Sequence, residues 1–243
     1  MNNIAIIPAR SGSKGLRDKN IKELNGIPLL GYSIGAAKKS GVFSHVMVST
    51  DSERYAEIAR KLGAEVPFLR SALTSSDNAG SWDVVKEVLR GYKERFDTVC
   101  LLQPTSPLRT AEDIVAGYRE LEDKNADAIT AVCEMDHSPL WSTPLDETLS
   151  LSELRKQLSD VPRQMLKTYY RINGALYIRR TRYNGEKIDI MDSNEFAYIM
   201  SRKRSVDIDT IDDFQYAEFL MKKRFPPNAK LDANISSWNH EEI

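Results

Sequence analysis

The sequence NIAIIPARSGSKGLRDKN, residues 3–20, decides the fold. It begins with Ile4-Ala5-Ile6-Ile7, a short apolar run that is typical of a buried parallel strand, and Pro8 ends the strand by removing a backbone donor. Glycine and serine follow, among four cations within ten residues: Arg10, Lys14, Arg17 and Lys19. A loop of this kind at the carboxyl end of the first strand of an open α/β sheet predicts a polyanion site, and a triphosphate fits it best.

The loop matches neither of the two common phosphate-binding signatures. A Walker A loop needs G-x-x-x-x-G-K-[ST], and a dinucleotide fold needs G-x-G-x-x-G. By itself, a loop of glycine, serine and cations is as consistent with a solvated surface turn as with a ligand site. Its place after the first strand favours the ligand site.

Composition narrows the class of protein. The chain has 243 residues, 41% hydrophobic and 28% charged, which is enough for one large α/β domain or two small ones. Its 34 Lys and Arg against 35 Asp and Glu leave a formal charge of −1, so no global field attracts nucleic acid or a membrane. The two cysteines, Cys100 and Cys133, suit free thiols in a reducing compartment. No apolar run approaches the roughly 20 residues that span a bilayer, so we expect a cytoplasmic protein.

Strands and helices alternate along the first half of the chain. Helices are predicted over 28–39, 53–62, 81–92 and 110–121, and strands over 46–49, 65–68, 97–102 and 128–133. The expected helix caps are Thr50 or Asp51, Ser81, and Thr110 with Asp113 in a capping box. This pattern predicts an α/β fold with a mainly parallel sheet and helices on both faces.

The alternation stops after 128–133. Residues 134–162 hold three prolines and no clean βαβ unit, which predicts an insertion that packs away from the main sheet; a plain surface excursion is the alternative. Further strands are predicted over 173–179, 195–200 and 207–209, before a helix that starts at Thr210. We expect a single domain over 1–243 that carries this insertion.

Several motifs occur in the same order in one known family. They are Pro8 to Leu16 with Lys19-Asn20, LLQPTSPLR at 101–109, Pro162-Arg163-Gln164, Arg171 with Asn173-Gly174-Ala175 and Tyr177, and Asp207-Ile208-Asp209-Thr210. In these motifs the chain resembles the acylneuraminate cytidylyltransferases, the CMP-sialic acid synthetases, over nearly its whole length. The resemblance implies a Rossmann-like nucleotidyltransferase fold and the joining of CTP to a free nine-carbon keto acid sugar, with release of pyrophosphate.

The resemblance also implies which residues hold CTP. The nucleotide-binding candidates are Arg10, Ser11, Ser13, Lys14, Asn20, Arg70 and Ser81. Arg70 and Ser81 match positions at the nucleoside end, and the basic loop matches positions that contact the triphosphate. Lys14, Lys19 and Asp209 are the candidate catalytic residues.

Two acids provide a candidate metal site. Asp207 and Asp209 are two residues apart, so in an extended segment both carboxylates point to one face. That arrangement suits Mg²⁺, which takes one or two carboxylates with phosphate oxygens and water. Taken alone, the acids are also consistent with the start of the helix at Thr210. The resemblance favours the metal, with Asp209 as the stronger ligand and magnesium at the α-phosphate.

The acceptor of such a reaction carries a carboxylate, which a planar guanidinium binds in a bidentate fork. The acceptor-binding candidates, by resemblance, are Gln103, Thr105, Arg163, Arg171, Asn173 and Tyr177, with Arg163 on the carboxylate. The chain departs from the family pattern where Ile190 and Met191 replace an expected aromatic pair. N-acetylneuraminate is therefore the leading acceptor and legionaminic acid the competing one. The octulosonate enzymes, a further alternative, carry a different arginine-rich loop.

Other features of the sequence leave alternatives. No general base can be named from the three histidines, since His45 is predicted at a strand edge and His137 in the insertion. The resemblance implies that the insertion is the arm of a homodimer and contributes to the neighbouring site. A nucleotide-binding regulatory protein without catalysis is the alternative from another class, although the loop cations and both aspartates are present.

Overall fold

The computed structural model describes residues 1–13, 15–157 and 167–224, and a seven-stranded sheet forms the centre of this part. Its strand order is β4-β1-β5-β7-β6-β9, with β8 paired to β7. The strands are β1 (Asn3–Pro8), β4 (His45–Ser49), β5 (Thr98–Leu101), β6 (Ala128–Glu134), β7 (Tyr170–Asn184), β8 (Lys187–Ile190) and β9 (Glu195–Met200). A separate two-stranded ribbon joins β2 (Glu23–Leu24) and β3 (Ile27–Pro28).

The direction of the strands confirms the predicted fold class. Strand β1 runs parallel to β4 and β5, and β6 runs parallel to β9. Strand β7 runs antiparallel to β5, β6 and β8, so every strand of this sheet except β7 shares one direction. The result is an α/β fold whose sheet is mainly parallel, with one long reversed strand at its centre.

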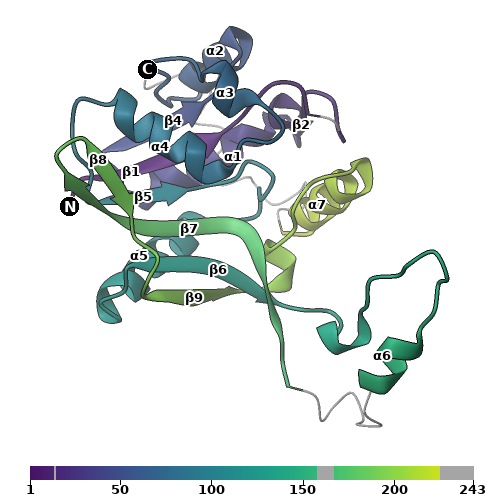
Figure 1. Cartoon of the computed structure of the whole chain (residues 1–243). Helices are drawn as coiled ribbons and strands as arrows, with labels where there is room; N and C mark the ends of the chain where they lie inside the picture. Colours follow the sequence, from purple (N-terminus) through teal and green to yellow (C-terminus); the bar gives the residue numbers. More distant parts are fainter. Residues whose placement is uncertain (14, 158–166, 225–243) are drawn as a thin grey trace.

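Helices cover both faces of the sheet (Figure 1). The helices are α1 (Leu29–Ser40), α2 (Glu53–Lys61), α3 (Ala72–Ser75), α4 (Ser81–Gly91), α5 (Ala111–Asp123), α6 (Ser152–Gln157) and α7 (Ile211–Arg224). On β1, Ala5 and Ile7 join the core with α1, α2 and α5, whereas Ile4 and Ile6 join the core with α4. A parallel strand buried on both faces explains why the run at residues 4–7 is continuously apolar.

Two predicted strands are wrong. Residues 65–68 form only a single bridge, from Glu65 to Met47, because Pro67 has no N–H with which to extend the pairing. Residues 207–209 have no regular structure; the Ile208 N–H donates to the Thr105 carbonyl at 2.9 Å, so this segment bonds to a turn instead of a strand. The capping box of Thr110 with Asp113 is confirmed at the start of α5.

The described part of the predicted insertion stands apart from the sheet (Figure 1). It leaves the end of β6, forms a 3₁₀ turn over Pro139–Trp141 and the short helix α6, and leads towards the start of β7. Residues 158–162 of the predicted insertion lie outside the described residues. Strand β7 starts at Tyr170, three residues earlier than predicted, because its first residues pair with the far end of β6.

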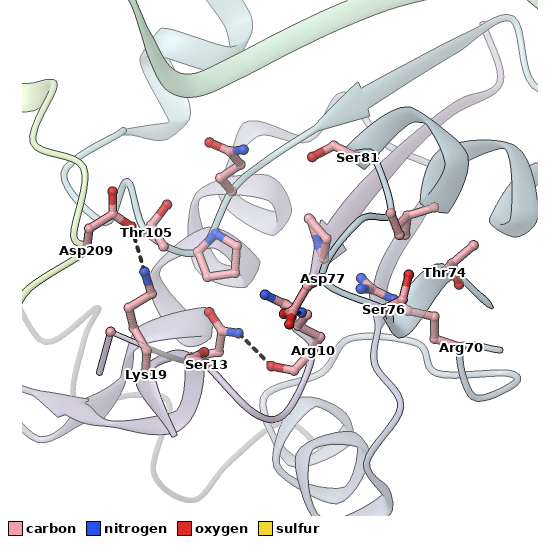
Figure 2. Close-up of a pocket in the computed structure, with 17 residues that line it drawn as sticks. Arg10, Ser13, Lys19, Arg70, Thr74, Ser76, Asp77, Ser81, Thr105 and Asp209 are labelled. Carbon is pink, nitrogen blue, oxygen red and sulfur yellow. Dashed lines mark hydrogen bonds and ion pairs between the residues drawn. The ribbon is translucent and has the colours of Figure 1, made fainter. Parts of the chain in front are cut away.

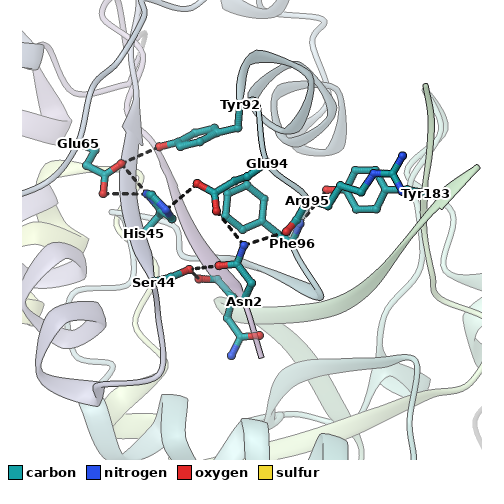
Figure 3. A network of polar contacts seen from close by, with 10 residues as sticks. Asn2, Ser44, His45, Glu65, Tyr92, Glu94, Arg95, Phe96 and Tyr183 are labelled. Atoms are coloured by element: carbon teal, nitrogen blue, oxygen red, sulfur yellow. Dashed lines mark hydrogen bonds and ion pairs between the residues drawn. The ribbon is translucent and has the colours of Figure 1, made fainter. Parts of the chain in front are cut away.

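A polar network closes the edge of the sheet where β4 begins (Figure 3). The two ring nitrogens of His45 lie 2.9 Å from carboxylate oxygens of Glu65 and Glu94, and the Tyr92 hydroxyl donates to Glu65 at 3.0 Å. His45 is therefore a structural residue at the amino end of its strand, as the sequence predicted. No helix in the described residues is both long and apolar enough to cross a membrane.

Candidate active site

A cavity of about 420 Å³ opens where β1 and β5 end (Figure 2). This is the edge at which open α/β sheets bind ligands, and the volume is in the range of small-molecule sites. Its lining is largely polar and comprises Pro8, Arg10, Ser13, Gly15, Lys19, Asn20, Arg70, Thr74, Ser76, Asp77, Ala79, Ser81, Val84, Gln103, Pro104, Thr105 and Asp209. Predicted nucleotide, acceptor and metal residues are thus brought together from distant parts of the chain.

The glycine-rich loop is held in shape by side chains outside it. Asp51 accepts hydrogen bonds from both the N–H and the hydroxyl of Ser11, at 2.7 and 2.8 Å, and Asn20 donates to the Arg10 carbonyl at 3.0 Å. Thr50 or Asp51 was expected to cap α2, but Ser52 occupies the N-cap position. The structure therefore gives Ser11 a carboxylate partner within the protein, whereas Arg10 and Ser13 line the cavity.

Lys19 connects this loop to the acidic segment near the end of the chain. Its Nζ donates to the Ile208 carbonyl at 2.6 Å and to Asp209 Oδ1 at 2.9 Å. Gly15 approaches the same segment so closely that a Cβ there would lie 2.7 Å from the Asp209 carbonyl oxygen. Lys14 lies outside the described residues, but its neighbours Ser13 and Gly15 share the cavity with Asp209.

Two arginines provide further positive charge. Arg10 Nη1 lies 2.6 Å from Asp77 Oδ1, and both side chains are partly exposed. Arg70 is buried, and its guanidinium donates to the hydroxyl and the carbonyl of Ser49 at 3.1 and 3.0 Å. Burial lowers the pKa of Arg70 to about 10, against the opposing influence of Asp51 and Glu87, so the side chain stays charged at neutral pH.

Short polar residues form the opposite end of the cavity. Ser71 caps α3, and Glu87 of α4 accepts from the Ser71 N–H at 2.8 Å and from the hydroxyls of Ser71 and Thr74. Gly80, not Ser81, is the N-cap of α4, so Ser81 is the first helical residue and lines the cavity. Site prediction from sequence missed Thr74, Ser76 and Asp77; the only signal was a run of small polar residues over 70–80.

The two acids differ in their surroundings. Asp209 is 76% exposed at the side chain, whereas Asp207 is partly buried and its Oδ1 is inaccessible with no hydrogen-bond partner among the described residues. Burial, and then the charge of Asp209, raises the pKa of Asp207, while Thr105, Lys19 and Arg171 oppose the shift. Of the two acids only Asp209 lines the cavity, and the unsatisfied carboxylate oxygen of Asp207 behind it fits a cation.

The described residues contain no cluster of three or more His, Cys, Asp or Glu side chains that could hold a metal ion. A Mg²⁺ ion here would therefore take two carboxylates from the chain and complete its shell with phosphate oxygens and water. Such a site suits a metal that arrives with a nucleotide better than a permanently bound one.

The predicted acceptor residues that the structure describes lie in the turn after β5 and on β7. Gln103 and Thr105 line the cavity. Asn173 is buried; its amide nitrogen donates to Ser205 Oγ at 2.9 Å, and its amide oxygen accepts from the Ala175 N–H at 3.1 Å. The side chain therefore stabilises the local backbone. Tyr177 does not line the cavity but packs edge-on against Trp82, with ring centroids 6.3 Å apart.

The remaining acceptor candidates are less clearly placed in the cavity. Arg171 donates to the Ser205 carbonyl at 3.2 Å and does not line the cavity. Arg163 lies outside the described residues. Ile190 ends β8 and packs beside the α4 core, and Met191 follows it in the chain.

Comparison with known proteins decides the family. A family model described as cytidylyltransferase matches residues 4–231. The chain belongs to the cytidylyltransferase family. The family agrees with the resemblance found in the sequence motifs.

The chain has relatives that are named for N-acylneuraminate and for N,N'-diacetyllegionaminic acid. It is 36% identical over 242 residues to the N-acylneuraminate cytidylyltransferase of Escherichia coli O18:K1:H7, covering 98% of the chain and 57% of that protein. It is 33% identical over 225 residues to the CMP-N,N'-diacetyllegionaminic acid synthase of Legionella pneumophila, covering 90% of the chain and 96% of that protein. The chain thus spans little more than half the length of the first relative and nearly all of the second.

A solved structure supports the fold. CMP:2-keto-3-deoxy-manno-octonic acid synthetase, solved in complex with CTP, superposes with a TM-score of 0.68 at 15% identity, covering 92% of this chain and 100% of that one. At this level of identity the likeness concerns the fold alone.

Proposed function

We propose that this cytidylyltransferase joins CTP and a free nine-carbon keto acid sugar to give the CMP-sugar and pyrophosphate. The observation that carries the proposal is the convergence of Arg10, Lys19 and Asp209 on one cavity at the carboxyl ends of β1 and β5. Cations there suit a triphosphate, and the adjacent acids suit its metal. The relatives named for neuraminate and legionaminate support the class of acceptor.

The proposed reaction is a direct displacement. The anomeric hydroxyl of the sugar attacks the α-phosphorus of CTP, a new P–O bond forms, and the bond to the β-phosphate oxygen breaks, so that pyrophosphate leaves. Arg10 and Lys19, with Lys14 by resemblance, hold the negative charge that moves onto the pyrophosphate. Arg70 and Ser81 lie at the proposed nucleoside end of the cavity.

Asp207 and Asp209 are the proposed ligands of Mg²⁺. When bound, the ion would neutralise charge at the α-phosphate and act there as a Lewis acid. In the structure Lys19 is paired with Asp209, and Arg10 with Asp77. Binding of a magnesium nucleotide would replace both ion pairs, because each cation could then turn to a phosphate. No histidine lines the cavity within the described residues, so we assign no imidazole base.

We propose that the acceptor binds between the turn at Gln103 and Thr105 and the stretch of β7 at Asn173 and Gly174, with Arg163 added by resemblance. N-acetylneuraminate is the leading acceptor. Legionaminate is the second candidate, favoured by Ile190 and Met191 and by the relative from Legionella pneumophila. We place the reaction in the cytoplasm, which suits the buried free thiols of Cys100 and Cys133.

We also propose that the chain works as a homodimer through its arm. Ile172 and Ile199 both lie opposite Val132 in the sheet, and they are 60% and 59% exposed, so they form an apolar row on an open face. The arm carries its own exposed apolar side chains: Leu140, Trp141, Leu145, Leu149 and Leu151. Two such surfaces on one chain suit a reciprocal contact between two copies.

The test of the reaction is pyrophosphate release from CTP with a panel of free acids: N-acetylneuraminate, legionaminate, pseudaminate and 3-deoxy-octulosonate. We expect release with at least one nine-carbon acid, dependent on Mg²⁺ and abolished by EDTA. ATP and UTP serve as nucleotide controls. Tight CTP binding without turnover on any acceptor would instead support the regulatory alternative.

A further inference from the structure

Arg109 is a buried guanidinium beside the cavity that none of the proposed contacts uses. It is 4% exposed and follows directly on the turn that carries Gln103 and Thr105. The acid that interacts with it electrostatically, Asp113, accepts its hydrogen bonds from Thr110, Tyr198 and Arg204 instead. A buried cation that depends on neutral partners is unfavourable for stability, so its presence calls for another explanation.

The guanidinium binds backbone from two strands at the point where they separate. The β5–β7 ladder ends with Leu101 opposite Tyr177, and the same register would next place Gln103 opposite Ala175. Arg109 Nη1 instead donates to the Ala175 carbonyl at 2.6 Å and lies 3.5 Å from the Gln103 carbonyl oxygen. The Arg109 guanidinium therefore replaces the backbone hydrogen bonds between β5 and β7 at the point where the two strands separate.

Arg109 is also connected to the Gln103 carbonyl through Ser33 of α1. Arg109 Nη2 donates to Ser33 Oγ at 2.5 Å, and Ser33 Oγ lies 3.3 Å from the Gln103 carbonyl oxygen that it donates to. Helix α1 is thereby tied to the same carbonyl that faces the guanidinium. The separation of the Gln103 turn from β7 is set by one planar group with fixed angles, which neither lysine nor an apolar side chain reproduces.

The segments that Arg109 joins, the Gln103 turn and the Gly174 stretch of β7, form the proposed acceptor subsite. Gly174 has φ +76°, and a Cβ there would lie 2.5 Å from Gln103 Oε1 and 3.3 Å from Ser106 Oγ. Ser106 Oγ also donates to the Asn173 carbonyl at 3.4 Å. The amide of Gln103 therefore lies directly against the backbone of β7 at Gly174, and any change in the separation of the turn from this strand moves the amide.

We propose that Arg109 is a positioning residue for the sugar acid: it holds the Gln103 turn and the Gly174 stretch of β7 at the separation that the acceptor requires, without contacting substrate. The inference rests on the proposed function, because it assigns the acceptor to these two segments. The glycine-rich loop and residues 70–81, which form the nucleotide half of the cavity, make none of these contacts with Arg109. Loss of the guanidinium therefore impairs use of the acceptor and spares CTP.

The experiment compares Arg109→Lys and Arg109→Met with the wild-type chain. At saturating Mg²⁺ and CTP, we expect kcat/KM for the acceptor to fall about tenfold in R109K and about 100-fold in R109M, as for other displaced substrate-positioning groups. Calorimetry should show the Kd for CTP with Mg²⁺ within about twofold of wild type in both. Arg180→Lys is the control, because Arg180 lies on β7, the strand to which Arg109 bonds, and like Arg109 donates to a backbone carbonyl, that of Ala126, at 2.9 Å, while it pairs with Glu122 away from the cavity.

The outcomes separate this inference from the proposed function. A wild-type chain that releases no pyrophosphate with any acceptor removes the proposed function, and the inference with it. With an active wild type, equal losses in CTP binding and acceptor use, or an R180K variant as impaired as R109K, would show a general structural effect and overturn the inference. If R109M does not fold, R109K decides, and an R109K variant with unchanged acceptor kinetics also overturns it.

Discussion

Lys19 Nζ lies 2.9 Å from Asp209 Oδ1, although 190 positions separate the two residues in the chain. The contact joins the first loop of the sheet to the segment that precedes its last helix. It places a cation and an acid at one wall of the cavity, where a magnesium nucleotide needs both. The lysine is 12% exposed and the aspartate 76%, so the acid is the partner that solvent, or an ion, can reach.

Replacing Lys19 by methionine should therefore abolish most of the activity. We expect kcat to fall by roughly 10²–10³, the usual effect of removing one preorganised charge contact. Steady-state pyrophosphate release measures the change. Lys22→Met is the matched control, because Lys22 belongs to the same segment but its ammonium lies over the Phe214 ring instead of in the cavity. Comparable losses in both variants would contradict the role given to Lys19.

Gly15→Ala should separate the loop from the acidic segment. The new Cβ would meet the Asp209 carbonyl oxygen, a backbone atom that cannot turn aside, at 2.7 Å. We expect weaker binding of CTP with Mg²⁺ and lower turnover, with little change in thermal stability. Gly41→Ala is the opposite control: Gly41 has φ +67° at the end of α1, so alanine there should cost about 1–2 kcal/mol of stability and leave kinetics intact. A fully active G15A chain would show that the loop does not need this approach.

Asp209→Asn should reduce turnover far more than it weakens CTP binding. The proposed metal contact is worth most when charge shifts onto the leaving pyrophosphate, so its loss appears mainly in kcat. Comparison of kcat with the calorimetric Kd for CTP provides the measurement. Equal losses in both quantities would mean that Asp209 only positions the nucleotide.

Asp51 supplies a prediction about pH. Its burial favours the neutral acid, but the two hydrogen bonds from Ser11, the Asp51 N–H and the charge of Arg70 together hold the pKa of Asp51 below its ordinary value of 3.8. A lowered folded-state pKa stabilises the fold at pH values above the unfolded-state pKa, and this stabilisation is lost as the pH falls through the folded-state pKa. Asp51→Asn should lower the Tm at pH 7, and the difference from wild type should shrink below about pH 4. A difference that is constant with pH would contradict this.

The homodimer is tested on the open face of the sheet. Ile199→Asp places a charge in the apolar row with Val132 and Ile172, and we expect sedimentation velocity to show a monomer. Phe219→Asp is the control, since Phe219 is as exposed, at 58%, but lies on α7. A wild-type chain that is monomeric at all concentrations would exclude the dimer. If the dimer dissociated in both variants, the apolar row would have no specific role in dimerisation.

The sequence predicted the fold well where one signal dominated. The apolar run before Pro8, and the capping box at Thr110, each depend on neighbouring residues and were read correctly. The strand predicted at 65–68 was wrong. A short segment of mixed polarity joins a sheet only if a neighbouring strand can pair with it, and Pro67 stopped the pairing.

For the candidate site, too, some residues could be predicted from the sequence and others could not. Resemblance pointed to Arg10, Lys19, Gln103 and Asp209, which line one cavity. Sequence could not reveal that Asp51 would hold Ser11, or that Arg109 would bridge two strands, because both contacts join residues far apart in the chain through backbone groups that every sequence contains. Such partners appear only when the topology is known.

The most direct test of the central claim is a crystal structure of the chain with CTP and Mn²⁺, with manganese located by its anomalous scattering. The account predicts a manganese peak bound by Asp207 and Asp209 beside the α-phosphate, with Arg10 and Lys19 turned to the triphosphate. Manganese and nucleotide bound away from this cavity, or a triphosphate that contacts neither Arg10 nor Lys19, would contradict it.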